Sequence, residues 1–180
     1  MKPTIIKIVS ALFLFASLTG CKKNYILSDN QLILFQFDHI NHAWGYQHAG
    51  YIIDNEGNVL IYNNPDNWNF PDKDLVLSEK DVEENLLLCN PVSVPIKDDE
   101  LRKYSAYIRH IASSKVTAIK SAGADAGKTE FICWQYSAST GEYKGYLIKM
   151  EGDFTCENLN FYSKKVVSWM KDIYRDLDLI

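Results

Sequence analysis

Apolar positions in the first part of the chain follow the pattern of β-strands. Residues 32–40, LILFQFDHI, are rich in strand-forming side chains and predict a first strand. The segments HAGYIID and VLIYN flank NEGN, where Gly57 can take the positive φ of a hairpin loop. Residues 63–74 contain Pro65, Pro71 and many Asn and Asp residues, so they predict a loop.

Two helices are predicted in the middle of the chain. The first is indicated by Ser78 and Asp81, whose spacing resembles a capping box. The second is predicted to begin after two prolines, with Asp98 as its N-cap. Each helix has one apolar face. The residues on these faces are Val82, Leu86 and Cys89 in the first helix, and Leu101, Tyr104, Ile108 and Ile111 in the second.

The C-terminal third predicts three strands and a final helix. Strand-forming residues fill segments 115–122, 129–138 and 142–150. Within the second, FICWQY is apolar on both faces, which predicts a central strand. The final helix is expected from about residue 160 to 177 and has an apolar stripe. The stripe consists of Val166, Met170, Ile173 and Leu177, joined by Trp169 and Tyr174.

These elements predict a single α+β domain over residues 31–180. It would consist of antiparallel β-hairpins, with about five to six strands, packed by about three helices. The chain has no internal repeat and no linker-like segment within this range.

The N-terminus has the pattern of an export signal. Lys2 and Lys7 precede an uncharged apolar run, residues 8–18, which is shorter than the roughly 20 residues that a membrane-spanning helix needs. The run ends in Leu18-Thr19-Gly20-Cys21.

This ending resembles the lipobox of bacterial lipoproteins. The resemblance covers residues 1–21 and implies cleavage before Cys21, with diacylglycerol on its sulfur and usually a further acyl chain on the new amino terminus. Two or more chains suffice for stable anchoring. Residues 1–20 would then be a signal peptide and 21–30 a lipid-anchored tether, with the membrane as the expected partner. The alternative is an ordinary secretory signal with an incidental cysteine.

The charge of the mature chain limits its partners. Without Lys2 and Lys7, 17 basic residues remain against 23 acidic ones, so the net charge is 17 − 23 = −6. An acidic surface argues against binding of nucleic acid or of anionic lipid. Residues 22 and 23 are lysines, and the acidic residue that marks inner-membrane retention in enterobacterial lipoproteins is missing. We therefore expect the outer membrane, with the domain on the periplasmic face.

Three cysteines remain once Cys21 is lipidated. Cys89, Cys133 and Cys156 allow one disulfide and one free thiol. Export permits a disulfide, but three buried thiols are equally compatible with the sequence.

Two candidate sites are weighed against structural roles. AGADAGKT, residues 122–129, resembles a phosphate loop, but a strand rather than a helix is predicted to follow, so we expect no nucleotide. The histidines of HINHAWGYQHAGYIID, with Asp38 or Asp54, could ligate zinc. The spacing of His39, His42 and His48 on and beside strands does not favour this, and we expect no metal and no cofactor.

A third site is suggested by a family resemblance. QHAGYIID and its hairpin resemble the histidine hairpin of circularly permuted papain-like hydrolases of the NlpC/P60 type. DFTCENLNFYSKKVVSW places Cys156 before the last predicted helix, whose dipole would favour a thiolate. The resemblance implies Cys156 as nucleophile and His48 as base of a cysteine hydrolase. The chain departs from the family by a three-strand stretch between the two residues and lacks a clear third polar residue. We therefore expect the two residues to lie far apart, with Cys156 unreactive.

Aromatic residues near the predicted loops suggest ligand binding. Rings beside Asn and Asp can stack on sugars, although such rings also cap small cores. The candidates are Trp44, Tyr46, Trp68 and Phe70. The leading hypothesis is therefore a lipid-anchored module that binds or scaffolds an envelope component, with no cofactor. The alternatives are the cysteine hydrolase and a glycan-binding lipoprotein.

Overall fold

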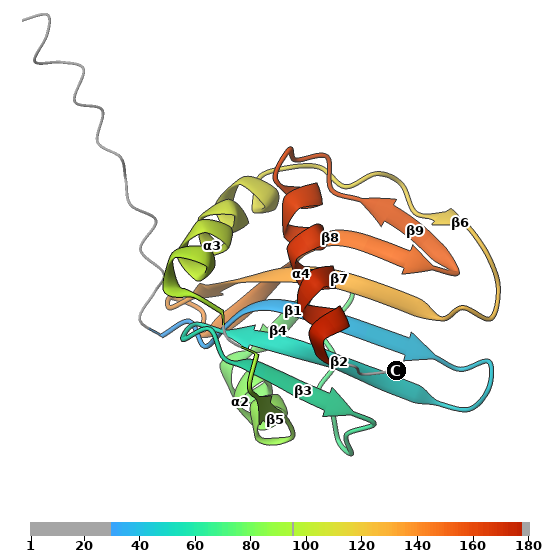
Figure 1. The fold of residues 1–180 in the computed structure, drawn as a ribbon, viewed down its shortest axis with the longest axis horizontal. Helices are drawn as coiled ribbons and strands as arrows, with labels where there is room; N and C mark the ends of the chain where they lie inside the picture. Colours follow the sequence, from blue (N-terminus) through green and yellow to red (C-terminus); the bar gives the residue numbers. More distant parts are fainter. Residues whose placement is uncertain (1–29, 95, 178–180) are drawn as a thin grey trace, which may run out of the picture.

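The computed structural model describes residues 30–94 and 96–177, which form one α+β domain (Figure 1). All neighbouring strands of its nine-stranded sheet are antiparallel. The predicted fold class is confirmed, although the sheet has more strands than the expected five to six. The strands are β1 (Ile33–Asn41), β2 (Gln47–Asp54), β3 (Val59–Asn63), β4 (Val76–Ser78), β5 (Asn90–Val92), β6 (Lys120–Ser121), β7 (Lys128–Ser137), β8 (Glu142–Gly152) and β9 (Phe154–Glu157). The helices are α2 (Glu79–Leu87), α3 (Asp98–Ala112) and α4 (Ser163–Leu177).

The strand order is β5-β3-β2-β1-β7-β8-β9-β6, and the short β4 pairs with β8. Strand β7 lies between β1 and β8, and its residues 131–134 are buried. The prediction that FICWQY forms a central strand is therefore confirmed. A strand covered on both faces needs apolar side chains on both, which explains the continuous apolar run.

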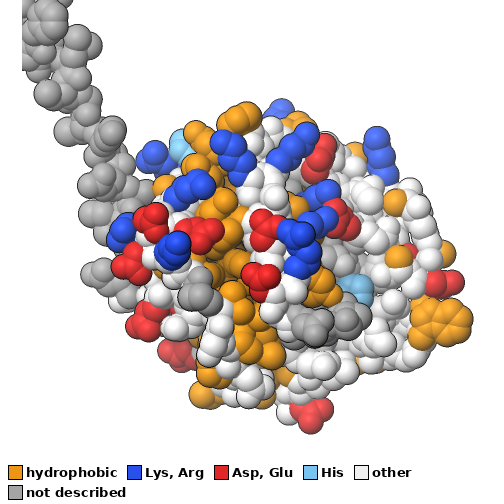
Figure 2. All heavy atoms as spheres, viewed as in Figure 1, with side chains coloured by type: hydrophobic (Ala, Val, Ile, Leu, Met, Phe, Trp, Pro, Cys, Tyr) orange, Lys and Arg blue, Asp and Glu red, His pale blue; other side chains and the backbone are white. Residues whose placement is uncertain are grey.

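Helices α3 and α4 cover one face of the sheet, and α2 lies on the other (Figure 1). The α4 side holds the larger core, which includes Phe35, Ile108 and Met170. The α2 side holds a second core, which includes Ile132 and Trp134. Figure 2 shows the α3 and α4 side, where charged side chains of both signs surround a band of apolar atoms.

Local sequence signals account for several element boundaries. Ser78 and Asp81 form the predicted capping box of α2, with both reciprocal hydrogen bonds present. Gly57 has the expected positive φ, 86°, between β2 and β3. The 64–75 loop follows β3, as predicted from its prolines and Asn and Asp residues.

Two helix starts differ from the predictions. The N-cap of α3 is Lys97, which makes no side-chain capping bond, and Asp98 is already helical. Its carboxylate is thus in the first turn, where the helix dipole favours it. Helix α4 begins at Ser163 rather than near Asn160. The Asn160 N–H donates to Asn158 Oδ1 at 2.9 Å, so a side chain supports a turn there instead of a helix.

The strand predictions were incomplete. Within the predicted strand 115–122, only the residues of β6 form a strand. Before β6, the Thr117 N–H donates to the Glu157 carbonyl of β9 at 2.9 Å. Strands β4, β5 and β9 were not predicted, because segments of three or four residues carry no recognisable period.

The predicted signal peptide and Cys21 lie outside the described residues. No helix within the described ranges is long and apolar enough to cross a bilayer.

Candidate functional site

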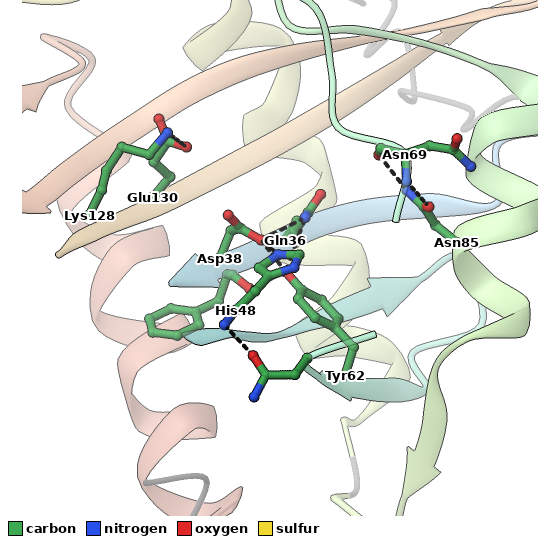
Figure 3. Close-up of polar contacts among 10 residues, drawn as sticks. Gln36, Asp38, His48, Tyr62, Asn69, Asn85, Lys128 and Glu130 are labelled. Atoms are coloured by element: carbon green, nitrogen blue, oxygen red, sulfur yellow. Dashed lines mark hydrogen bonds and ion pairs between the residues drawn. The ribbon is translucent and has the colours of Figure 1, made fainter. Parts of the chain in front are cut away.

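A buried polar cluster lies on the α2 side of the sheet (Figure 3). One oxygen of the Asp38 carboxylate, Oδ1, accepts hydrogen bonds from three side chains. His48 Nε2 lies 2.9 Å away, the Tyr62 hydroxyl 2.5 Å and Gln36 Nε2 3.5 Å. All four side chains are at most 5% exposed as residues. Since burying a carboxylate is costly without hydrogen bonds, these donors are what holds Asp38 inside the sheet.

Gly50 makes this cluster possible. Asp38 on β1 and Tyr62 on β3 are both register partners of Gly50 on the intervening β2. A Cβ at Gly50 would lie 2.4 Å from the Tyr62 hydroxyl oxygen. The missing side chain therefore leaves the space through which Tyr62 reaches Asp38. Burial and the nearby Asp38 raise the Tyr62 pKa well above its usual value.

His48 is fully enclosed by aromatic rings. The centroids of Tyr62, Trp68 and Phe70 lie 5.0–5.4 Å from that of the His48 ring. Its Nδ1 has no hydrogen-bond partner among the described residues. With no solvent exposure, the imidazole cannot meet a substrate. Its role in this geometry is to position the Asp38 carboxylate through Nε2.

A cavity of about 310 Å³ opens beside Asp38. Its floor is formed by β1 and β7 and its cover by the 64–75 loop. The lining includes Gln36, Asp38, Glu130, Trp68, Phe70 and Leu75. Within the described part of the chain, no hydrogen bond involves Asp38 Oδ2 or Gln36 Oε1. Two residues that line the cavity therefore carry an acceptor atom that no described donor satisfies, and the cavity volume is within the range of small-molecule sites.

A second carboxylate faces the same cavity. Glu130 on β7 is the direct register partner of Asp38 on β1, so the two side chains share a face. Lys128 Nζ pairs with Glu130 Oε2 at 2.8 Å. In residues 30–94 and 96–177, no Lys or Arg nitrogen lies within 4 Å of the Asp38 carboxylate. Figure 3 shows the second Asp38 oxygen turned away from His48, toward the side of Lys128 and Glu130.

The 64–75 loop is fixed over the cavity by side-chain amides. Asn85 of α2 exchanges two hydrogen bonds of 2.8 Å with the backbone of Asn69 (Figure 3). At the start of the loop, His48 N–H donates to Asn64 Oδ1 at 2.7 Å. At its end, Asp72 Oδ1 accepts from the backbone N–H groups of Asp74 in the loop and Val76 at the start of β4. The cavity walls are thus preformed, which favours binding because less ordering is needed.

Two of the four predicted ligand-binding aromatics reach the cavity. Trp68, 9% exposed, and Phe70, 49% exposed, both line it. Trp44 and Tyr46 lie on the β1–β2 hairpin, 82% and 51% exposed, and do not line it. Four residues of the site were not predicted from the sequence: Gln36, Tyr62, Lys128 and Glu130. The available signal was the alternation of polar residues in otherwise apolar strands, at 36 and 38 and at 128 and 130.

The pair needed for a cysteine hydrolase is not assembled. Cys156 lies in β9, and three strands separate β9 from His48 on β2. Four strand spacings amount to about 19 Å. Cys156 also does not precede α4 directly, because the strand and a turn come first, so the helix dipole does not act on it. Burial, and then the charge of Glu130, raise the Cys156 thiol pKa.

The other candidate chemistries have structural roles. Cys89, Cys133 and Cys156 are all free thiols, and burial raises the Cys89 pKa to about 12. His39 Nδ1 lies 2.8 Å from Thr129 Oγ1. Thr129 itself lies within β7, so no helix begins at the phosphate-loop-like segment. Across the described ranges, no three His, Cys, Asp or Glu side chains gather to hold a metal ion.

A larger hollow, of about 510 Å³, lies on the opposite face beside α4. It has aromatic walls that include Phe37 and Phe131. The charged groups there are already paired. Glu151 binds Lys149 and Lys171, and Asp172 binds Arg175. The cavity beside Asp38, whose lining includes acceptors that the described residues leave free, is therefore the better candidate site.

Comparisons of the chain with protein-family models, with curated proteins and with solved structures give no match.

Proposed function

We propose that this protein is a lipid-anchored module of the bacterial cell envelope that binds a small polar ligand in the cavity beside Asp38. The observation that carries the proposal is that the two oxygens of one buried carboxylate have different hydrogen-bonding environments. Oδ1 is satisfied by three internal donors, and Oδ2 faces the cavity without one. A free acceptor in a preformed cavity is complementary to a ligand that donates hydrogen bonds.

Binding fits this site better than catalysis. His48 is shut off from the cavity by its own burial, and three strands lie between His48 on β2 and Cys156 on β9. Stacking surfaces support a saccharide as a second, more specific candidate. Trp68 and Phe70 line the cavity close to the free acceptors of Gln36 and Asp38, and sugars combine apolar faces with hydroxyl donors.

The proposed location is supported by the N-terminal sequence. The lipobox-like residues before Cys21 indicate lipidation there, and the two following lysines favour the outer membrane with the domain in the periplasm. Labelling cells with a radioactive fatty acid tests this. Label should enter the wild type and the Cys89→Ser control and be missing from Cys21→Ser. Equal label in all three proteins would remove the anchor from the proposal.

The binding function is tested by thermal unfolding of the full mature lipoprotein in detergent. Glucose, N-acetylglucosamine, glucosamine and putrescine serve as probes. A ligand at about 100 times its Kd adds about 2.7 kcal/mol to the free energy of unfolding, so the melting temperature should rise measurably. Ile40→Trp, which fills the cavity, should abolish the rise, whereas Ile119→Trp at an exposed position should preserve it. No rise with any probe, or an equal rise in both variants, would count against the function.

A further inference from the structure

We infer that the ligand of the cavity beside Asp38 carries a primary ammonium group, which binds between the carboxylates of Asp38 and Glu130. This inference rests on the proposed binding function and specifies its ligand class. The class is a small organic amine with a polar or slightly apolar body, such as an amino sugar or a short diamine.

The first reason is the juxtaposition of the two carboxylates. Asp38 and Glu130 are direct cross-strand partners on one face, the position in which side chains of neighbouring strands interact. Like charges in this position repel each other and destabilise the sheet. Both side chains are also largely buried, with 7% of Asp38 and 12% of Glu130 exposed. A cation between them would remove the repulsion.

The second reason is that the protein's own cations do not complete the site. Lys128 Nζ pairs with Glu130 at 2.8 Å, and no other Lys or Arg of the described residues pairs with this carboxylate. Asp38 Oδ2 likewise has no cation within 4 Å in those residues. Lys73 and Asp72, at the cover of the cavity, are of opposite charge, and Asp72 is bonded to its own loop. The free charge on the cavity floor is therefore negative.

The third reason is the hydrogen-bonding chemistry of the cavity lining. Gln36, Asp38 and Glu130 all line the cavity, and no hydrogen bond within the described residues involves Asp38 Oδ2 or Gln36 Oε1. An ammonium group has three N–H donors and no acceptor, so it is complementary to a lining whose free groups are acceptors. A hydroxyl group supplies only one donor and needs further donors in return.

The aromatic wall fits the same ligand. Trp68 and Phe70 line the cavity beside the carboxylates. Ring faces attract cations, most strongly for tryptophan and in sites removed from water. The ring of Trp68 also packs on Tyr62 at 4.2 Å between centroids, so its orientation is fixed. The volume of about 310 Å³ limits the ligand to a small molecule.

Matched probes that differ only in the amine test the inference. Calorimetric titrations of the full mature lipoprotein would compare glucosamine with glucose and putrescine with butanediol. Because a charge-assisted hydrogen bond contributes more than a neutral one, at least one amine should bind about tenfold or more tightly than its neutral partner.

Conservative variants assign the effect to the carboxylates. Asp38→Asn retains an oxygen for the His48, Tyr62 and Gln36 donors and replaces the free oxygen with an NH₂ group. Glu130→Gln provides a second test that leaves the buried cluster untouched. Both should weaken amine binding about tenfold or more and change neutral probes much less. Asp99→Asn on α3, on the other face, is the control and should bind like the wild type.

The possible outcomes distinguish a failure of the ammonium inference from a failure of the proposed binding function. Equal affinity for the amine and neutral members of both pairs would overturn the ammonium inference and leave the binding function standing. An amine preference that persists in both Asp38→Asn and Glu130→Gln would overturn the assignment of the ammonium site to these two carboxylates. No binding of any probe would overturn the inference together with the proposed function.

Discussion

Tyr62 donates a hydrogen bond of 2.5 Å to Asp38, although their strands β3 and β1 are separated by β2. The contact crosses Gly50, which has no side chain to block it. The hydroxyl also accepts from Gln36 Nε2 at 3.1 Å. One phenol thus links three neighbouring strands around a single carboxylate. The candidate site therefore depends on a residue that never touches the cavity.

Removing this hydroxyl should destabilise the protein. Tyr62→Phe keeps the ring in its core but takes one donor from Asp38 and one acceptor from Gln36. We expect a loss of about 1–3 kcal/mol in the free energy of unfolding, as for other buried polar groups that lose a partner. Urea denaturation measures it. Tyr46→Phe, whose side chain is half exposed, should change stability by less than about 0.5 kcal/mol. Similar losses in both variants would show that the Tyr62 hydroxyl does not stabilise the cluster.

The Gly50→Ala variant, which adds a methyl group, should also disrupt this cluster. The new Cβ would lie 2.1 Å from the Phe37 carbonyl oxygen and 2.4 Å from the Tyr62 hydroxyl oxygen. Backbone and buried ring would both have to move, and overpacking of this kind costs about 1–3 kcal/mol or more. The combination with Tyr62→Phe tests the mechanism. Because the two changes affect one contact, their losses should add up to more than the double variant loses. Strict additivity would argue against a shared mechanism.

Sequence patterns predicted the parts of this fold that have a period or a local signal. β1, β2, β3, β7 and β8, and the apolar faces of the helices, follow from alternation and 3.6-residue spacing. The site was harder to predict. Asp38 and Glu130 are 92 positions apart in the chain, and only the strand order makes them neighbours. Nothing local to QHAGYIID distinguishes a catalytic histidine from one that positions a carboxylate. That distinction depends on Tyr62, Trp68 and Phe70, which enclose the ring.

The central strand should be sensitive to loss of volume. Trp134 in β7 is fully buried in the α2-side core. We expect Trp134→Ala to cost about 3–5 kcal/mol of unfolding free energy. Trp134→Phe is the matched control and should cost clearly less. It keeps a ring in place, and the indole Nε1 it removes has no hydrogen-bond partner among the described residues. A loss under about 1 kcal/mol for Trp134→Ala would contradict the central position of β7.

Buried tyrosines should make stability fall in alkaline solution. Burial raises the pKa of Tyr51 and Tyr62 well above 10 and that of Tyr143 to about 12. Below about pH 10 these groups are protonated in the folded and unfolded chains alike, so they add no pH dependence. Above it, the unfolded chain releases the protons and the folded chain keeps them. The unfolded chain then binds fewer protons, so the free energy of unfolding decreases as the pH rises.

The contribution of Tyr62 can be isolated by comparing variants across this range. Each tyrosine that stays protonated only in the folded state contributes up to about 1.4 kcal/mol per pH unit. Urea denaturation from about pH 8 to about pH 11 should give a shallower decrease for Tyr62→Phe than for the wild type. Lysines titrate in the same range, but they are common to both proteins and cancel in the difference. Tyr46→Phe should follow the wild type, because its partly exposed phenol is not part of the buried cluster. Parallel curves for Tyr62→Phe and the wild type would mean that the phenol ionises as easily when folded. The tight packing of Tyr62 against Asp38 and Gly50 would then be wrong, and with it the structural basis of the cavity floor.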